Sequence, residues 1–448
     1  MNTVVDTQKL DSFWMPYTPN RQFKGEPRLV GSAKGIAFQT LDGRSVLDGT
    51  SGLWCVGAGH RHPRIAEAMK KQIDVLDFAS NFQVGHPGAF ELSERIAELS
   101  PPGLDRVFLV NSGSEACDTA MKIALAYWQA IGQGQRSLFV GRERDFHGVG
   151  FGGMSVGGMP NNRRVFGNAM LRCDHLQSTW QPATQAFVRG QPTVGAELAD
   201  ELEQRILALH GDNNVAAVIV EPIAGSTGVL VPPVGYLQRL REICDRYGLL
   251  LIFDEVITGF GRFGGMFASD FFGVQPDMVL FAKTVSNGAA PLGGVIVHRK
   301  IHDAIMQGPL HLSELMHGYT CSGHPLACAA GLAMLDVIEQ ESLIQRVREL
   351  IPCFENAVHE LSTLSSVLSV RNFGLAAGIE LTVLKGQPGR HGARVQQVAF
   401  DLGLLTRAPG DSIVLAPPFV CTPSDIENMV QRLAQAIQVV SKESESMQ

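Results

Sequence analysis

The middle of the chain contains six short hydrophobic segments, which are separated by longer and partly polar stretches. These segments lack a regular polar alternation, as is typical of strands buried on both faces of a sheet. We predict strands at Arg106–Val110, Ser137–Val140, Val215–Val220, Leu249–Phe253, Met278–Phe281 and Gly293–His298. Between them we predict a helix at Ser114–Ile131, which follows a Ser-Gly-Ser turn, and a helix at Gly235–Tyr247, which has the residue spacing of an amphipathic helix. This alternation predicts an α/β fold with a mostly parallel central sheet and helices on both faces.

The alternation of strands and helices stops towards both ends of the chain. A long hydrophobic helix is predicted at Pro325–Glu339, and further helices and short strands follow it. The first residues of the chain also lack the strand–helix pattern. We therefore predict a large domain at 66–325 and a smaller α+β domain that is built from 1–65 and 326–448.

Composition narrows the class of protein. Of the 448 residues, 45% are hydrophobic and 18% are charged, which favours a large core over disorder. The net charge of −7 gives no basic excess, so we expect no nucleic-acid partner. No hydrophobic run approaches the roughly 18 residues that cross a membrane, and the N-terminus lacks the pattern of a secretory signal. The eight cysteines form no C-x-x-C pair, so we expect a cytoplasmic protein without a structural metal.

Small residues lie between the first predicted strand and the helix that follows it. Ser112, Gly113 and Ser114 begin that helix, and Glu115 lies in its first turn. The backbone N–H groups and the positive dipole end of a helix N-terminus form a site for a phosphate or another anion. The same residues also suit a helix cap that binds no ligand.

Ionisable side chains follow three other predicted strands. Asp254 and Glu255 end the strand at Leu249–Phe253, and Glu221 ends the strand at Val215–Val220. Lys283 follows the strand at Met278–Phe281 after a single alanine. Because parallel strands end at one edge of a sheet, these groups are expected to face the same ligand-binding crevice. A helix cap or an ion pair is the alternative role for each of them.

Together, these features are the parts that a pyridoxal phosphate site requires. A helix N-terminus binds the phosphate, an aspartate keeps the pyridine nitrogen protonated, and a desolvated lysine forms a Schiff base. Two G-x-G-x-x-G matches, at 148–153 and 259–264, do not lie directly between a strand and a helix. They therefore do not indicate a nicotinamide or flavin site, and the chain has no P-loop motif.

At these residues the sequence resembles the class III (ω-) aminotransferases of the fold-type I pyridoxal-phosphate superfamily. It is most similar to the bacterial β-alanine (ω-amino acid):pyruvate aminotransferases. The most specific motif is Asp254-Glu-Val-Ile-Thr-Gly-Phe-Gly-Arg262, with Lys283 placed 29 residues after Asp254. Further matching segments are Phe13–Tyr17, Ser51–His60, Ser112–Glu115, Val220–Pro222, His317–Thr320 and the segment around Arg407.

The resemblance implies a role for individual residues. Lys283 would form the Schiff base and move the proton, and Asp254 would pair with the pyridine nitrogen. Val256 and Phe146 would pack on the two faces of the ring. Further cofactor contacts are implied for Ser112, Gly113, Ser114, His147 and Glu221, and for Thr320 of the neighbouring subunit. Substrate contacts are implied for Tyr17, Trp54 and Arg407, with Arg407 binding a carboxylate.

The implied reaction is a ping-pong transamination from β-alanine or a similar amine to pyruvate, in a homodimer with shared active sites or in a homotetramer. Taurine or a polyamine is an alternative donor. An aminomutase, a racemase, a decarboxylase or a non-catalytic protein of this fold is an alternative function. The sequence departs from the usual family pattern at Phe146 (more often Tyr), Cys321 (Tyr) and Ala408-Pro409 (an aromatic residue). These departures bear on the choice of amine.

Overall fold

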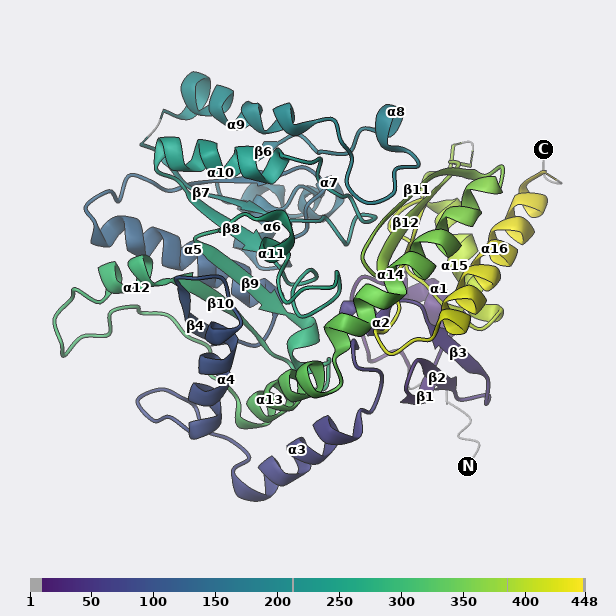
Figure 1. Ribbon diagram of the computed structural model, residues 1–448, viewed down its shortest axis with the longest axis horizontal. Coiled ribbons are helices and arrows are strands. Elements are labelled where there is room, and N and C mark those ends of the chain that lie inside the picture. Colours follow the sequence, from purple (N-terminus) through teal and green to yellow (C-terminus); the bar gives the residue numbers. More distant parts are fainter. Residues whose placement is uncertain (1–9, 212, 385, 446–448) are drawn as a thin grey trace.

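The computed structural model describes residues 10–211, 213–384 and 386–445 and is built around a large twisted sheet (Figure 1). Within the described residues this sheet has seven strands. In spatial order they are β4 (Leu104–Val110), β10 (Gly293–His298), β9 (Met278–Ala282), β8 (Leu250–Asp254), β7 (Val215–Val220), β5 (Leu138–Arg142) and β6 (Cys173–Leu176). β10 runs antiparallel to both of its neighbours, and the other adjacent pairs are parallel. The mostly parallel α/β sheet predicted from the sequence is therefore confirmed.

The predicted strands agree with six of these seven strands to within two residues at either end. The strand that the hydrophobic pattern missed is β6, which has the sequence Cys-Asp-His-Leu and lies at the edge of the sheet. An edge strand has one neighbour and is partly exposed, so it does not need a continuous hydrophobic sequence. The direction of β10 was also not readable from its composition.

Helices pack on the two faces of the sheet, and alternate strand residues face each of them. Ile219 of β7 and Ile252 of β8 pack in a core with α5 (Gly113–Ala130). The preceding residues, Val218 and Leu251, pack in another core with α10 (Tyr236–Tyr247). This alternation explains why β7 is hydrophobic at every position and β8 at every position before Asp254.

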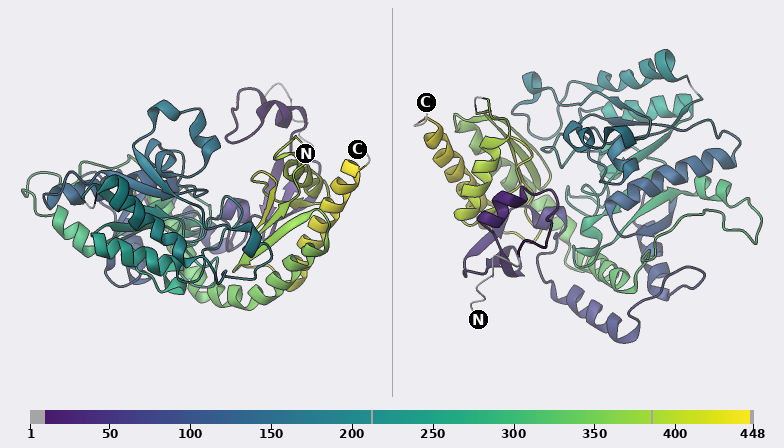
Figure 2. Two further views of the ribbon diagram at one scale, coloured as in Figure 1. Left: turned by 90° about the horizontal axis from the view of Figure 1, so that it is seen from above. Right: turned by 180° about the vertical axis from the view of Figure 1, so that it is seen from behind.

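A smaller part of the structure combines the two ends of the chain (Figure 2). One sheet contains β1 (Val30–Lys34), β2 (Ala37–Thr40), β3 (Ser45–Asp48) and β13 (Leu404–Leu405), and another contains β11 (Val367–Phe373), β12 (Ala376–Leu381) and β14 (Ser412–Leu415). The parallel pairing of β13 with β3 joins the C-terminal part to the N-terminal part. The boundaries at residues 65 and 325 stay a prediction.

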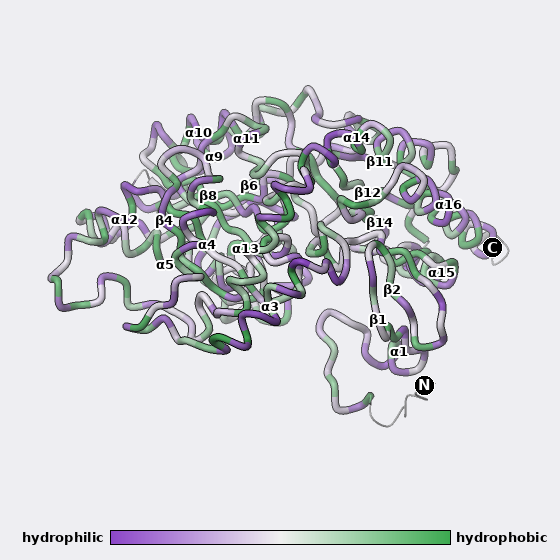
Figure 3. Tube along the Cα trace, turned by 60° about the horizontal axis from the view of Figure 1, so that its bottom comes forward, coloured by the Kyte–Doolittle hydropathy of each residue, from purple (hydrophilic) through white to green (hydrophobic). Residues whose placement is uncertain are grey.

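The other helices surround these sheets. They are α1 (Asn20–Gly25), α2 (Ser51–Trp54), α3 (Pro63–Val75), α4 (Pro87–Glu98), α6 (Phe151–Val156), α7 (Pro160–Arg164), α8 (Pro182–Gln185), α9 (Asp200–Arg205), α11 (Ala268–Phe272), α12 (Arg299–Ile305), α13 (Pro325–Gln340), α14 (Leu343–Glu360), α15 (Arg390–Asp401) and α16 (Pro423–Glu445). Hydrophilic and hydrophobic residues are mixed along peripheral helices such as α3 and α16, as expected for helices with one buried face (Figure 3). In the part of the chain that is described, no helix is both long and apolar enough to span a membrane.

Candidate active site

The C-terminal ends of the parallel strands meet at one cavity. Its lining residues come from the segments that follow β4, β5, β7, β8 and β9. They are Gly113, Ser114, Phe146, His147, Gly148, Glu221, Ser226, Asp254, Val256, Ile257 and Lys283. Residues from five separate strands thus face one space, as the positions of strand ends in a parallel sheet require.

One side of the cavity is the N-terminus of α5. Ser112 is the N-cap of this helix, and its hydroxyl oxygen accepts a hydrogen bond from the Glu115 N–H at 3.2 Å. The Ser114 hydroxyl oxygen accepts a hydrogen bond from the Val149 N–H at 3.1 Å. The structure thus shows the helix cap, and the remaining N–H groups of the first turn have no acceptor within the helix. Gly113 lets the helix end approach closely, since a Cβ at this position would lie 2.9 Å from a Val256 methyl group.

Asp254 ends β8 with its side chain buried against a histidine. Its Oδ2 lies 2.8 Å from His147 Nδ1, and its Oδ1 accepts a hydrogen bond from the Val256 N–H at 3.1 Å. The neighbouring Glu255 has a different role, because it accepts hydrogen bonds from the backbone N–H groups of Ala268 and Ser269 at the start of α11. The two consecutive carboxylates therefore divide into one that lines the cavity and one that caps a helix.

Lys283 lies at the end of β9, where it begins a short 3-10 helix that ends at Ser286. Its φ of 54° is in the left-handed region, a strained conformation that is concentrated at functional sites. Burial lowers the pKa of the Lys283 ammonium below its ordinary value, although the negative charges of Asp254 and Glu221 oppose that shift. The lower pKa raises the fraction of neutral amine, which is the nucleophilic form.

Glu221 connects the end of β7 to the segment that contains Phe146. Its Oε1 accepts a hydrogen bond from the Phe146 N–H at 2.8 Å, and its Oε2 accepts one from the Gly225 N–H at 3.0 Å. Burial, together with the charges of Asp145 and Asp254, raises the pKa of the Glu221 carboxyl to about 8. The pKa of this buried carboxyl therefore lies above that of an exposed glutamate.

Two residues at this edge were missed by sequence reasoning. Arg142 ends β5, and its guanidinium donates to Asp145 Oδ1 from Nη2 at 3.0 Å. Asp145 Oδ2 in turn accepts a hydrogen bond from the Glu221 N–H at 3.0 Å. Both residues are buried, although their polar sequence, Gly-Arg-Glu-Arg-Asp, is typical of a solvated loop. Their position at and shortly after the end of a hydrophobic strand was the signal that would have identified them.

The three residues implied in substrate binding lie outside the group of cavity-lining residues. Tyr17 is 68% exposed, and its ring meets the Phe146 ring edge-on at a centroid distance of 6.4 Å. Burial lowers the pKa of the Arg407 guanidinium, and the positive charge of Arg407 in turn lowers the pKa of Lys283. Trp54 is only 2% exposed and packs in a hydrophobic core. The role of Trp54 as a wall of the substrate pocket therefore stays a prediction.

Thr320 is also separate from the cavity of its own chain. It is exposed in the loop between α12 and α13. Two large hydrophobic side chains of the same loop, Leu310 and Met316, are exposed as well. A cofactor contact from Thr320 thus stays a prediction.

The residues of the cavity fit pyridoxal phosphate. The N-terminus of α5 offers N–H donors for a phosphate, and the Asp254 carboxylate makes its close polar contacts with His147 and the Val256 N–H rather than with a lysine or arginine. Lys283 supplies an amine of lowered pKa in the same cavity. This donor set therefore offers a partner for the phosphate, the ring nitrogen and the carbonyl carbon of the cofactor.

Residues 20–437 match the aminotransferase class-III family. The chain belongs to this family, whose members are pyridoxal-phosphate-dependent transferases of fold type I. It is 52% identical to an ω-aminotransferase from Caulobacter vibrioides, over 96% of this chain and 97% of that protein. It is 45% identical to a β-alanine–pyruvate aminotransferase from Pseudomonas aeruginosa, over 96% of both chains. Among solved structures, the ω-transaminase from Pseudomonas jessenii in complex with PMP has a TM-score of 0.92 at 30% identity, covering 98% of this chain and 99% of that one.

Proposed function

We propose that the protein transfers the amino group of an ω-amino acid or primary amine, of which β-alanine is the type, to pyruvate. The products are an oxo-acid or aldehyde and L-alanine, formed in a ping-pong reaction. The observation that carries this proposal is the meeting of Lys283, Asp254 and the α5 N-terminus at one cavity. The names of the relatives from Caulobacter vibrioides and Pseudomonas aeruginosa support the choice of amine and acceptor.

The residues divide the work of this reaction. Bound pyridoxal phosphate supplies an electron sink next to the transferred nitrogen. Ser112, Gly113 and Ser114 hold the phosphate through backbone N–H groups and hydroxyls. Asp254 holds the proton on the ring nitrogen, and Lys283 takes the proton from the substrate carbon and returns it. The side chains of Val256 and Phe146 flank the ring.

We assign recognition of the substrate carboxylate to Arg407, because a guanidinium binds a carboxylate through two parallel hydrogen bonds. Arg407→Ala should therefore raise the KM for pyruvate and β-alanine far more than the KM for a neutral arylalkylamine. Loss of a charge-assisted pair predicts a decrease of roughly tenfold to a hundredfold in kcat/KM for pyruvate and for β-alanine. Steady-state kinetics with each donor measures this difference. Arg407→Lys, which keeps the charge but loses the planar fork, should be intermediate, and unchanged saturation by pyruvate in Arg407→Ala would place the carboxylate contact elsewhere.

We further propose a homodimer with two shared active sites, which is able to pair into a homotetramer, in the cytoplasm. The support comes from the surface around Thr320. A groove there is lined by the exposed side chains of Phe82, Val84 and Phe90 and by His317 and Gly318. Exposed hydrophobic patches of this kind mark protein interfaces, and a stable dimer of this type buries above roughly 2,000 Å² in total. A two-fold dimer would bring Thr320 of each chain to the α5 N-terminus of the other.

Thr320→Ala is expected to weaken retention of the cofactor by about 1–2 kcal/mol, the loss of one hydrogen bond to a charged phosphate. Equilibrium dialysis of pyridoxal phosphate measures this loss. Thr363→Ala is the matched control. Thr363 is exposed and is the last residue of the short 3-10 helix that follows α14. Sedimentation should show a dimer at working concentration, and an active, cofactor-loaded monomer would contradict the shared site.

A panel of amine donors with pyruvate as acceptor tests the proposed function. We expect alanine to accumulate fastest with β-alanine or a related ω-amino acid. A panel in which taurine or a polyamine is the best donor would move the assignment to that alternative. The absence of alanine with every donor would contradict transamination to pyruvate altogether.

A further inference from the structure

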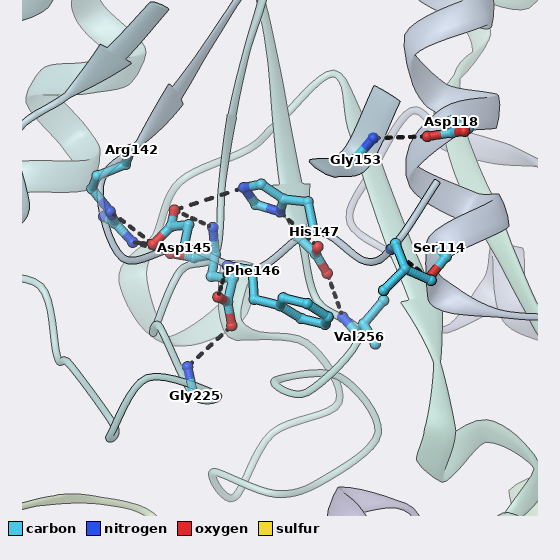
Figure 4. A network of polar contacts seen from close by, with 12 residues as sticks. Ser114, Asp118, Arg142, Asp145, Phe146, His147, Gly153, Gly225 and Val256 are labelled. Atoms are coloured by element: carbon cyan, nitrogen blue, oxygen red, sulfur yellow. Dashed lines mark hydrogen bonds and ion pairs between the residues drawn. The ribbon is translucent and has the colours of Figure 1, made fainter. Parts of the chain in front are cut away.

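Four buried polar side chains form a continuous series from β5 to the cavity, and the first three of them are labelled in Figure 4. Arg142 contacts Asp145, Asp145 faces His147, and His147 contacts Asp254. None of the four is more than 4% exposed. We call Arg142, Asp145, His147 and Asp254 the strand-end network. Its last member lines the cavity, and its first two members have no contact with the cavity's interior.

His147 lies between the two carboxylates of this network. Its Nδ1 is 2.8 Å from Asp254 Oδ2, and its Nε2 is 3.9 Å from Asp145 Oδ2. Nε2 is buried and has no hydrogen-bond partner among the described residues. A neutral ring that donates to Asp254 would turn the lone pair of Nε2 towards the Asp145 carboxylate, which is unfavourable. A ring protonated on both nitrogens instead faces a carboxyl group on each side. Burial raises the pKa of the Asp145 carboxyl, and the charge of Arg142 opposes that shift.

The groups around His147 favour the doubly protonated ring. Burial lowers the pKa of the His147 imidazolium, but its hydrogen bond to Asp254 raises that pKa. The charges of Asp254 and Asp145 add to this effect, so that the pKa lies above its ordinary value. On the side of α5, Cys117 is buried and burial raises the pKa of its thiol well above the ordinary value, which keeps it neutral. Also on α5, the Asp118 carboxylate accepts a hydrogen bond from the Gly153 N–H at 2.8 Å.

Asp145 is held in place independently of the cavity. Its Oδ1 accepts two hydrogen bonds from Arg142, from Nε at 3.2 Å and from Nη2 at 3.0 Å. Its Oδ2 accepts a hydrogen bond from the Glu221 N–H at 3.0 Å. Arg142 Nη2 also donates to the Glu221 carbonyl oxygen at 2.6 Å. The position of the Asp145 carboxylate is therefore determined by two strands rather than by a ligand.

We propose that Asp145 is a positioning residue that keeps His147 doubly protonated, so that His147 holds the Asp254 carboxylate in a fixed orientation and charge state. A positive charge on His147 disfavours transfer of a ring-nitrogen proton to Asp254, because that proton would leave the imidazolium without its counter-charge. The ring nitrogen of the cofactor thus stays protonated during catalysis. This inference rests on the proposed function and extends it to residues beyond the cavity.

The first test is the pH dependence of Asp145→Asn. Removing one negative neighbour lowers the pKa of His147, so the variant loses the imidazolium as the pH rises, while the wild-type protein retains it. We expect kcat within about threefold of the wild-type value near pH 6 and roughly tenfold or more below it near pH 8, since one pKa unit changes the protonated fraction about tenfold. Asp145→Glu, which keeps the charge, should restore the activity near pH 8.

Asp118→Asn is the matched control. It makes the same change from acid to amide on α5, whose N-terminus lines the same cavity, and the Asp118 carboxylate contacts the Gly153 N–H rather than His147. The ratio of the kcat of Asp118→Asn to the kcat of the wild-type protein should be the same at every pH. A loss in Asp145→Asn that is equal at every pH would overturn the proposal and leave Asp145 with a purely structural role.

The second test does not depend on activity. Histidine-labelled protein is titrated by NMR with and without pyridoxal phosphate, and the His147 signal is identified by its absence in His147→Gln. We expect a doubly protonated His147 in the wild-type protein up to about pH 8 and a lower titration midpoint in Asp145→Asn. A neutral His147 in the wild-type protein at neutral pH would refute the proposal even if Asp145→Asn does not fold. If no donor gives alanine but the NMR titration gives the expected result, the proposed function is wrong and the doubly protonated state of His147 still holds.

Discussion

Lys283→Ala is expected to abolish turnover with every amine donor. Without the ε-amino group, the cofactor has no covalent attachment and the substrate carbon has no base at the end of β9. General-base catalysis and covalent catalysis each contribute orders of magnitude to the rate, so residual kcat should fall by at least about 10⁴-fold. Borohydride reduction of the loaded protein followed by peptide mapping measures the attachment, and it should label Lys283 in the wild-type protein and not in the variant.

Two further variants make this test specific. Lys283→Arg keeps a cation at the site but has no amine that forms a Schiff base, so it should be as inactive as Lys283→Ala. Lys34→Ala changes an exposed lysine at the end of β1 and should retain the full activity. Reductive labelling at a lysine other than Lys283 would show that the cofactor is attached elsewhere.

Asp254→Asn has the second largest expected effect. The amide has no charge to hold the proton on the ring nitrogen, and breaking one side of a buried ion pair costs about 3–5 kcal/mol. If this cost falls on the transition state, kcat decreases by a factor on the order of a hundred to several thousand. Steady-state kinetics checks this value, and the cofactor should remain bound through the phosphate site.

Glu255→Gln separates this catalytic effect from a structural one. Glu255 is as deeply buried as Asp254, but its carboxylate accepts hydrogen bonds at the start of α11 and a further one from the Thr258 hydroxyl at 3.0 Å. Its replacement should lower the melting temperature more than it lowers kcat. If Asp254→Asn were nearly as active as the wild-type protein, the pairing of Asp254 with the ring nitrogen would be wrong.

Much of the fold was predictable from sequence because the central strands are buried on both faces. Strands such as Val215–Val220 are hydrophobic at every position since both α5 and α10 cover the sheet. The edge strand β6 lacked this signal, and the N-terminal strands β1 and β3 have mixed burial patterns. The antiparallel direction of β10 depends on the connections around it rather than on its own residues.

The candidate site was predictable to the extent that its residues follow hydrophobic strands. That rule identified Asp254, Glu221 and Lys283, and the structure places all three at one cavity. It would equally have identified Arg142 and Asp145, but their charged surroundings in the sequence favoured a solvated loop. The sequence also did not show that Asp254 lines the cavity whereas Glu255 caps a helix, because this difference depends on α11 starting beside Glu255. Such contacts are formed by segments that are distant in the chain.

We propose that this protein stores an amino group from one substrate and passes it to another. The most direct measurement separates the two half-reactions. The loaded protein is mixed with β-alanine alone, the donor and its product are removed, and pyruvate is then added while alanine is counted. We expect about one alanine per subunit, together with an equal amount of oxo-acid or aldehyde from the first step. Release of carbon dioxide or a rearranged amine in the first step, with no alanine in the second, would contradict the assignment as an aminotransferase.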